Sequence, residues 1–83
     1  MLVPLYGFLR GDTLGLVILV QDTDRIRQVA ANLQQAAEVR VAPSAVAQVW
    51  AHGRRLPPEL TVAEAGLVAL DRIDVVPEPE PRG

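Results

Sequence analysis

The run LGLVILV, residues 14–20, is the feature of this 83-residue chain that most restricts its fold. It is short and rich in branched side chains, which favours a strand over a helix. Side chains alternate between the two faces of a strand, and here both faces would be apolar, unlike a strand with one wet face. We therefore expect a covering on each side. One face would hold Leu14, Leu16, Ile18 and Val20, and the other face would hold Val17 and Leu19.

The size of the chain limits how much of this apolar surface it can bury by itself. Eighty-three residues make one domain. A domain this small removes only somewhat over ~60% of its unfolded surface from water. Hydrophobic residues nevertheless make up 49% of the sequence. This surplus favours a partner that covers part of the surface.

The charge and cysteine content exclude several classes of function. Eight basic residues, all of them Arg, stand against ten acidic ones, for a net charge of -2. This balance gives no electrostatic footprint for nucleic acid. The absence of Cys excludes disulfides, thiolate metal sites and thiol nucleophiles. With no run of about 20 apolar residues and no signal-peptide pattern, we expect a cytoplasmic protein without a membrane segment.

The first half of the chain predicts a hairpin followed by a helix. Residues 3–10 form a first strand, and Gly11-Asp12-Thr13 makes the turn into the second. A helix should run from Arg25 to about Val39, with Asp24 as the preferred N-cap and Thr23 or Asp22 as alternatives. Its apolar stripe would consist of Ile26, Val29, Ala30, Leu33 and Ala37, and its polar side of Arg27, Gln28, Gln34, Gln35 and Glu38.

The second half predicts two more strands joined by a stiff connection. Residues 46–52 form a third strand, and Gly53 with Arg54-Arg55 forms a turn. Thr61 and Glu64 have the spacing of a capping box for one helical turn, which Gly66 would end. Residues 72–76 form the last strand, and residues 77–83 read as a flexible acidic, proline-rich tail whose removal should leave folding unchanged.

This order predicts an α+β fold of the β-grasp type. A mixed sheet of four to five strands would carry one main helix across one face, with the short helical turn before the last strand. GDTLGLVI at 11–18 resembles the first turn and second strand of ubiquitin. The segment from VWAHGRRLPPELTVAEAGL to DRIDVV resembles its last third. The ubiquitin-like domain would span residues 1–76.

No catalytic, cofactor-binding or metal-binding set is expected. A Ser–His–acid triad would have to use Ser44, which lies beside a proline, and His52. His52 and Asp74 could lie side by side on the sheet, but two ligands are too few for a metal site. The pair Arg54-Arg55 could hold an anion, but a solvated turn or a partner salt bridge is the preferred explanation.

What remains is binding through the sheet face that the helix does not cover. Trp50 at the centre of a small apolar face rimmed by charge is typical of an interaction anchor. The alternative is that Trp50 packs into the core. The candidate interface consists of Trp50, His52, Asp74, Val76, Val17, Leu19, Arg54 and Arg55.

Four short motifs also resemble a specific family. They are QVA at 28–30, RVAP at 40–43, TVAEAGL at 61–67 and RIDVV at 72–76. In this order and spacing the chain resembles the small gamma (B) subunit of bacterial multicomponent toluene, aromatic and alkene (isoprene-type) monooxygenases. The tail 77–83 extends past the usual end of such subunits, and the first strand matches only loosely.

The resemblance implies a non-catalytic role in a larger enzyme. The hydroxylase would contain two copies each of alpha, beta and gamma subunits, with a di-iron centre in the alpha subunit. A Rieske ferredoxin, an NADH-dependent reductase and an effector protein would serve it in oxidising aromatic or alkene hydrocarbons. The gamma subunit would hold no cofactor and would contribute assembly and stability.

Two other ubiquitin-like functions stay open. A conjugated modifier or sulfur carrier needs a flexible C-terminus ending in Gly-Gly, whereas EPEPRG ends with a single Gly after alternating prolines. A stand-alone adaptor domain has no support beyond the fold.

Overall fold

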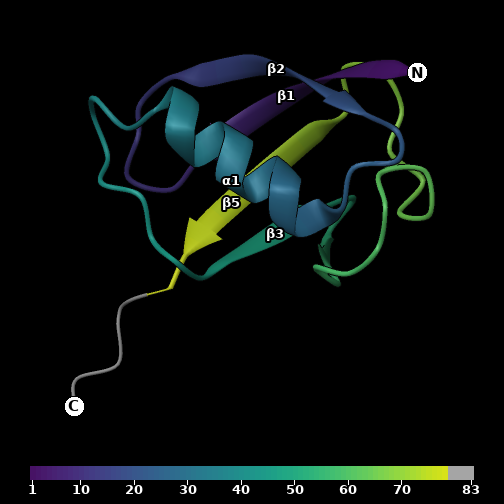
Figure 1. Ribbon diagram of the computed structural model, residues 1–83. Coiled ribbons are helices and arrows are strands. Elements are labelled where there is room, and N and C mark those ends of the chain that lie inside the picture. The colour runs from purple at the N-terminus through teal and green to yellow at the C-terminus, as the bar shows by residue number, and fades with distance from the viewer. Residues whose placement is uncertain (79–83) are drawn as a thin grey trace.

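The structure is a computed structural model that describes residues 1–78 (Figure 1). These residues form five strands and one α-helix, and the helix lies across one face of the sheet. In chain order the elements are β1 (Leu2–Leu9), β2 (Gly15–Gln21), α1 (Ile26–Ala36), β3 (Ala47–Ala51), β4 (Arg54–Leu56) and β5 (Arg72–Pro77).

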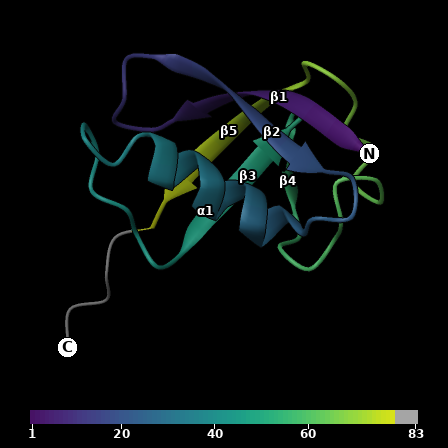
Figure 2. The ribbon, with the colours of Figure 1, turned by 45° about the horizontal axis from the view of Figure 1, so that its top comes forward.

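The strands form one mixed sheet in the order β2-β1-β5-β3-β4. β1 pairs antiparallel with β2 and parallel with β5, while β3 lies antiparallel to both β5 and β4. The two views agree that β2 forms an outer edge and that α1 leaves the opposite face of the sheet uncovered (Figure 2). The expected β-grasp architecture is confirmed, and the sheet, for which we expect four to five strands, has five.

The core lies between α1 and the sheet. The apolar stripe predicted for the helix is buried, and the inward residues of the strands face it. The fully buried large side chains are Leu5, Val20, Ile26, Val29, Leu33, Val49, Val62, Ile73 and Val75.

The start of α1 differs from the prediction. The residue before the helix is Arg25, in extended conformation, and no side chain caps it. The Asp24 carboxylate instead accepts a hydrogen bond from the Gln21 N–H at 2.8 Å. The first helical N–H groups are met by backbone carbonyls, because Ile26 donates to Leu60 at 2.8 Å and Arg27 to Pro58 at 3.1 Å. Asp24 is therefore not the N-cap, and neither Thr23 nor Asp22 is.

Two other helix predictions need correction. The helix ends at Ala36 rather than near Val39, and a turn follows in which Arg40 and Val41 donate to the Ala37 carbonyl. Gln34, predicted on the polar side, is only 5% exposed. Its amide accepts from the Ser44 N–H at 2.7 Å and donates to the Ser44 carbonyl at 3.2 Å. The segment after the helix thereby returns to the sheet across a buried polar contact.

The Arg54-Arg55 pair lies in a strand, not in a turn. The turn consists of His52 and Gly53, with φ angles of 53° and 77°. Two residues with positive φ are the usual connection of a tight hairpin. Because Gly53 has no Cβ, it adopts this backbone without strain. The turn therefore ends two residues earlier than predicted, and β4 begins at Arg54.

The connection before β5 follows the prediction. The Thr61 N–H donates to the Glu64 carboxylate at 3.0 Å, and the Glu64 N–H donates to the Thr61 hydroxyl at 3.1 Å. This is the predicted capping box. Gly66, with φ of 74°, ends the turn.

β5 continues one residue beyond the predicted last strand. Pro77 pairs with Ala47, and the Glu78 N–H donates to the Val46 carbonyl at 2.9 Å. The Ser44 hydroxyl donates to the Glu78 carbonyl at 3.0 Å. The start of the predicted tail therefore lies against the chain, and its remaining residues, 79–83, lie outside the described residues. No helix within residues 1–78 is long and apolar enough to cross a membrane.

Candidate partner-binding face

The sheet face opposite α1 is the candidate functional site. Side chains on each strand alternate between the core and this face. The buried residues Val3, Leu5 and Leu9 of β1, for example, alternate with side chains that point away from α1. We call this surface the outer face. Its members are Leu2, Pro4, Tyr6 and Phe8 of β1, Val17 and Leu19 of β2, Gln48 and Trp50 of β3, Arg55 of β4, and Arg72, Asp74 and Val76 of β5.

The β2 side of the outer face is apolar and exposed. Val17 is 59% exposed and Leu19 is 62% exposed, and they lie opposite Tyr6 and Pro4 of β1. Leu2, at the start of β1, is 58% exposed. Large apolar side chains gathered at this exposure are typical of a surface that another molecule covers.

Aromatic rings and one ion pair form the centre of the outer face. The rings of Tyr6 and Phe8 stack with their centroids 4.9 Å apart, and the Arg72 guanidinium lies 4.1 Å above the Phe8 ring. Arg72 also pairs with Asp74 at 3.0 Å. A Cβ atom at Gly15 would lie 2.3 Å from the Tyr6 ring. Glycine at this position therefore lets the rings lie flat across β2.

Trp50 belongs to the outer face and not to the core. It is 38% exposed, and its indole N–H donates to the Gln48 side chain at 3.3 Å. Gln48 in turn donates to the Glu78 carboxylate at 2.8 Å. A shallow groove of about 520 Å³ separates Trp50 from Phe8 and Arg72. A half-exposed indole beside a groove is the kind of side chain that anchors protein contacts.

Six of the eight predicted interface residues share the outer face, and two do not. His52 lies in the turn after β3, and its Nε2 is 3.2 Å from the Asp71 carboxylate rather than beside Asp74. Arg54 lies opposite the buried Ala51, so it points to the other side of the sheet from Arg55. The residues that come together are Val17, Leu19, Trp50, Arg55, Asp74 and Val76.

Sequence reasoning missed the contribution of β1 and Arg72 to this face. Leu2, Tyr6 and Phe8 alternate with buried apolar residues along LVPLYGFL. The period-two pattern was therefore present, but both of its phases are apolar and only the neighbours in the sheet show which phase faces outward. Arg72 could have been found from its position two residues before Asp74 on the same strand.

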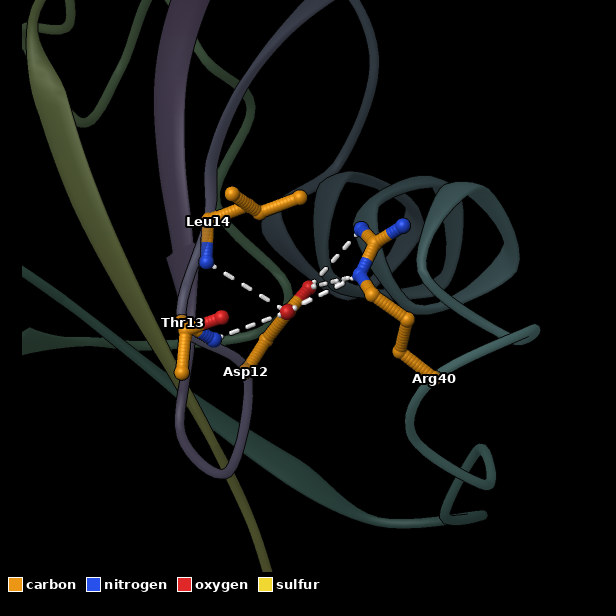
Figure 3. Close-up of polar contacts among 4 residues, drawn as sticks. All are labelled: Asp12, Thr13, Leu14 and Arg40. Carbon is orange, nitrogen blue, oxygen red and sulfur yellow. Dashed lines mark hydrogen bonds and ion pairs between the residues drawn. The ribbon is translucent and has the colours of Figure 1, made fainter.

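A second polar cluster ties the β1–β2 turn to the segment after α1 (Figure 3). The Asp12 carboxylate accepts three hydrogen bonds from Arg40: Nε donates to its two oxygens at 2.9 Å and 3.1 Å, and Nη2 donates to one of them at 2.9 Å. It also accepts from the N–H groups of Thr13 at 2.8 Å and Leu14 at 3.3 Å. Its side chain is 2% exposed. These hydrogen bonds lower the pKa of Asp12 below its ordinary value, and those from Arg40 have the largest effect. The same contact raises the pKa of Arg40.

The residues that a Ser–His–acid triad would require have other partners. The Ser44 hydroxyl donates to the carbonyls of Val46 at 2.9 Å and Glu78 at 3.0 Å, whereas His52 contacts Asp71. Ser44 and His52 therefore do not form a nucleophile–base pair. Within residues 1–78, no three His, Cys, Asp or Glu side chains gather in a way that could hold a metal ion.

The chain has the fold of ubiquitin. Ubiquitin from Caldiarchaeum subterraneum matches it with a TM-score of 0.79 at 13% identity, over 99% of this chain and 100% of that one. A ubiquitin-like domain of an Arabidopsis thaliana protein matches with a TM-score of 0.75 at 13% identity, over 99% of this chain and 83% of that one. At these identities the likeness shows the fold alone.

Residues 2–76 match the family described as Toluene-4-monooxygenase system protein B (TmoB), and the chain belongs to this family. It is similar to a chain in the solved structure of the toluene 4 monooxygenase HD complex with the inhibitor 4-bromobenzoate. The identity is 32% and the TM-score 0.86, over 94% of this chain and 100% of that chain. Among curated proteins, none matches this sequence.

Proposed function

We propose that this chain is the small gamma (B) subunit of a multicomponent monooxygenase hydroxylase and that it contributes to assembly and stability without doing chemistry. The observation that supports this most strongly is the 32% identity, over the whole length of the other chain, to a chain of the toluene 4 monooxygenase HD complex. Membership of the system protein B family is consistent with it.

In this proposal the hydroxylase is a cytoplasmic bacterial assembly of two alpha, two beta and two gamma subunits. The di-iron centre belongs to the alpha subunit, and residues 1–78 of this chain gather no three metal-ligating side chains. A Rieske ferredoxin, an NADH-dependent reductase and an effector protein serve the hydroxylase. In this proposal the hydrocarbon substrate is selected in the alpha subunit.

The outer face is the surface proposed to contact the larger subunits. It combines exposed aliphatic side chains on β1 and β2 with Trp50, and Arg55, Arg72 and Asp74 supply charge around them. Interfaces of this kind have an apolar and aromatic centre with a polar rim. The ion pair of Arg72 with Asp74 is exposed, so it favours orientation more than affinity.

Native mass spectrometry of the complex purified through a tag on this chain tests the proposal. The expected result is an assembly that contains two copies each of this chain and of two kinds of larger subunit, with iron bound to the largest. A free monomer, or a covalent adduct at the C-terminus, would contradict the proposal and favour an adaptor or a modifier instead.

A further inference from the structure

The two edges of the sheet differ in how well they are protected against further strand pairing. β4, at one edge, is three residues long and carries Arg54 and Arg55. β2, at the other edge, is seven residues long, GLVILVQ, and contains no charged residue and no proline. Soluble proteins normally protect edge strands by charge, proline or shortness. β4 has this protection and β2 lacks it.

The hydrogen-bond pattern shows which backbone groups of β2 face outward. In an antiparallel pair, residues alternate between bonding their partner and pointing away from it. The Asp22 N–H donates to the Met1 carbonyl at 3.0 Å, so even-numbered residues of β2 bond β1. The Gln21 N–H points away and is taken by the Asp24 carboxylate. By this alternation Val17 and Leu19 direct their N–H and carbonyl groups to the open edge, and no partner for them occurs within residues 1–78.

The surroundings of this edge define what would fit it. On the helix side, a groove of about 340 Å³ lies between β2 and α1, lined by Ile18, Leu19, Asn32, Gln35 and Ala36. On the other side are the exposed side chains of Val17 and Leu19. Both sides are uncharged. A strand placed along β2 would have to be neutral, with small or apolar side chains turned into the groove.

We infer that the open edge of β2 binds an extended, uncharged segment of a larger hydroxylase subunit, which adds a sixth strand to the sheet. This inference rests on the proposed function. Val17 and Leu19 belong both to this edge and to the outer face, so one partner could cover the two surfaces continuously. Main-chain hydrogen bonds would supply affinity, and the groove beside α1 would supply selectivity.

A second copy of the chain is the less suitable occupant. A stable complex normally buries on the order of 800 Å² per partner. Two β2 strands side by side would share only the backbone groups around Val17 and Leu19, together with a narrow strip of side chains. A large subunit that also contacts the outer face would bury more area than a second β2 strand.

Hydrogen–deuterium exchange at single-residue resolution tests the inference on the purified hydroxylase and on the isolated chain. Exchange at the Val17 and Leu19 amides should be slowed by at least about tenfold in the complex, as one added hydrogen bond at each would cause. The Leu16 and Ile18 amides, which bond β1, should be protected in both samples. The inference would be overturned if the Val17 and Leu19 amides were protected in a dimer of this chain alone, or if their exchange in the complex were unchanged.

A matched pair of variants gives a second readout. Val17→Pro removes an outward N–H without breaking a bond to β1. Pro4 of β1, opposite Leu19, is already a proline at a position of this strand pair that makes no bond across it. Val17→Ala shortens the same side chain but keeps the N–H. The proline variant should bind the hydroxylase at least about tenfold more weakly than the alanine variant, with similar melting temperatures. Equal binding by the two variants would contradict strand addition at β2 but would leave the proposed function as a hydroxylase subunit intact. Failure of the wild-type chain to co-purify with the hydroxylase would contradict both the strand addition and the proposed function.

Discussion

Trp50 illustrates at the residue scale how the sheet separates core from contact surface. Its neighbours Val49 and Ala51 are buried, and Trp50 points the opposite way and remains 38% exposed. Its indole N–H is satisfied by Gln48, so the ring can be covered by a partner without leaving a buried donor unpaired. This geometry combines a large apolar area with a satisfied polar atom.

Replacing Trp50 by alanine should weaken partner binding by about 2 kcal/mol, since truncated aromatic anchors at interfaces have this effect. The measurement is a titration of the variant against gamma-depleted hydroxylase, with thermal unfolding of the free chain as the control. A large drop in melting temperature with unchanged binding would instead make Trp50 a core residue.

Asp12 makes the stability of the hairpin turn depend on pH. Because its folded-state pKa lies below the ordinary value of 3.8, the carboxylate contributes stability above that value, and the contribution is lost as the pH falls toward the folded-state pKa. Glu64 has a lowered pKa as well, chiefly through the Thr61 N–H, and acts in the same direction.

The substitution Asp12→Asn distinguishes the effect of the Asp12 carboxylate on the pH dependence of stability from that of Glu64. The amide oxygen can still accept from Thr13 and Leu14, but the charge that faces Arg40 is lost. Urea unfolding of both proteins should show the wild type more stable at neutral pH, with the difference shrinking below pH 3.8. A difference that stays constant across this range would show that the ion pair does not control the pH dependence.

At the scale of elements, β5 and the residues just after it close the sheet. Pro77 pairs with Ala47, and Glu78 contacts Val46, Gln48 and Ser44. We therefore expect that removing Pro77 and Glu78 would destabilise the fold, in contrast to the sequence-based expectation that the whole segment 77–83 can be removed without effect.

Two truncations test this expectation. A chain that ends at Glu78 keeps every contact described and should melt at the wild-type temperature. A chain that ends at Val76 loses the backbone bond to Val46 and the bond from Ser44, at about 1 kcal/mol each. Differential scanning calorimetry distinguishes the two, and equal melting of both chains would show that these bonds contribute little.

The elements that could be predicted from sequence are those specified by local patterns. Alternation gives the faces of β5, where Ile73 and Val75 alternate with Asp74, and the spacing of Thr61 and Glu64 gives the capping box. The start of α1 depends on carbonyls of Pro58 and Leu60, which are distant in sequence and come close only in the fold. Likewise, His52 meets Asp71 because two loops converge, and no spacing within the strand indicates this.

At the scale of the whole molecule, the uncovered outer face and the open edge of β2 account for the hydrophobic surplus of the sequence. They meet at Val17 and Leu19, which are among the most exposed large apolar side chains of the sheet. The fold buries one complete core on the helix side and leaves a second, apolar surface on the other. A subunit that exists to dock against a larger protein would have this organisation.

The most direct test of that claim is to place one negative charge on each side of the molecule and measure assembly. Leu19→Glu puts it on the outer face, and Gln28→Glu puts the same charge on an exposed position of α1. With both variants folded, native mass spectrometry of reconstituted hydroxylase should show gamma-subunit incorporation lost for Leu19→Glu and retained for Gln28→Glu. Full incorporation of Leu19→Glu, or equal loss for both, would contradict docking through the outer face.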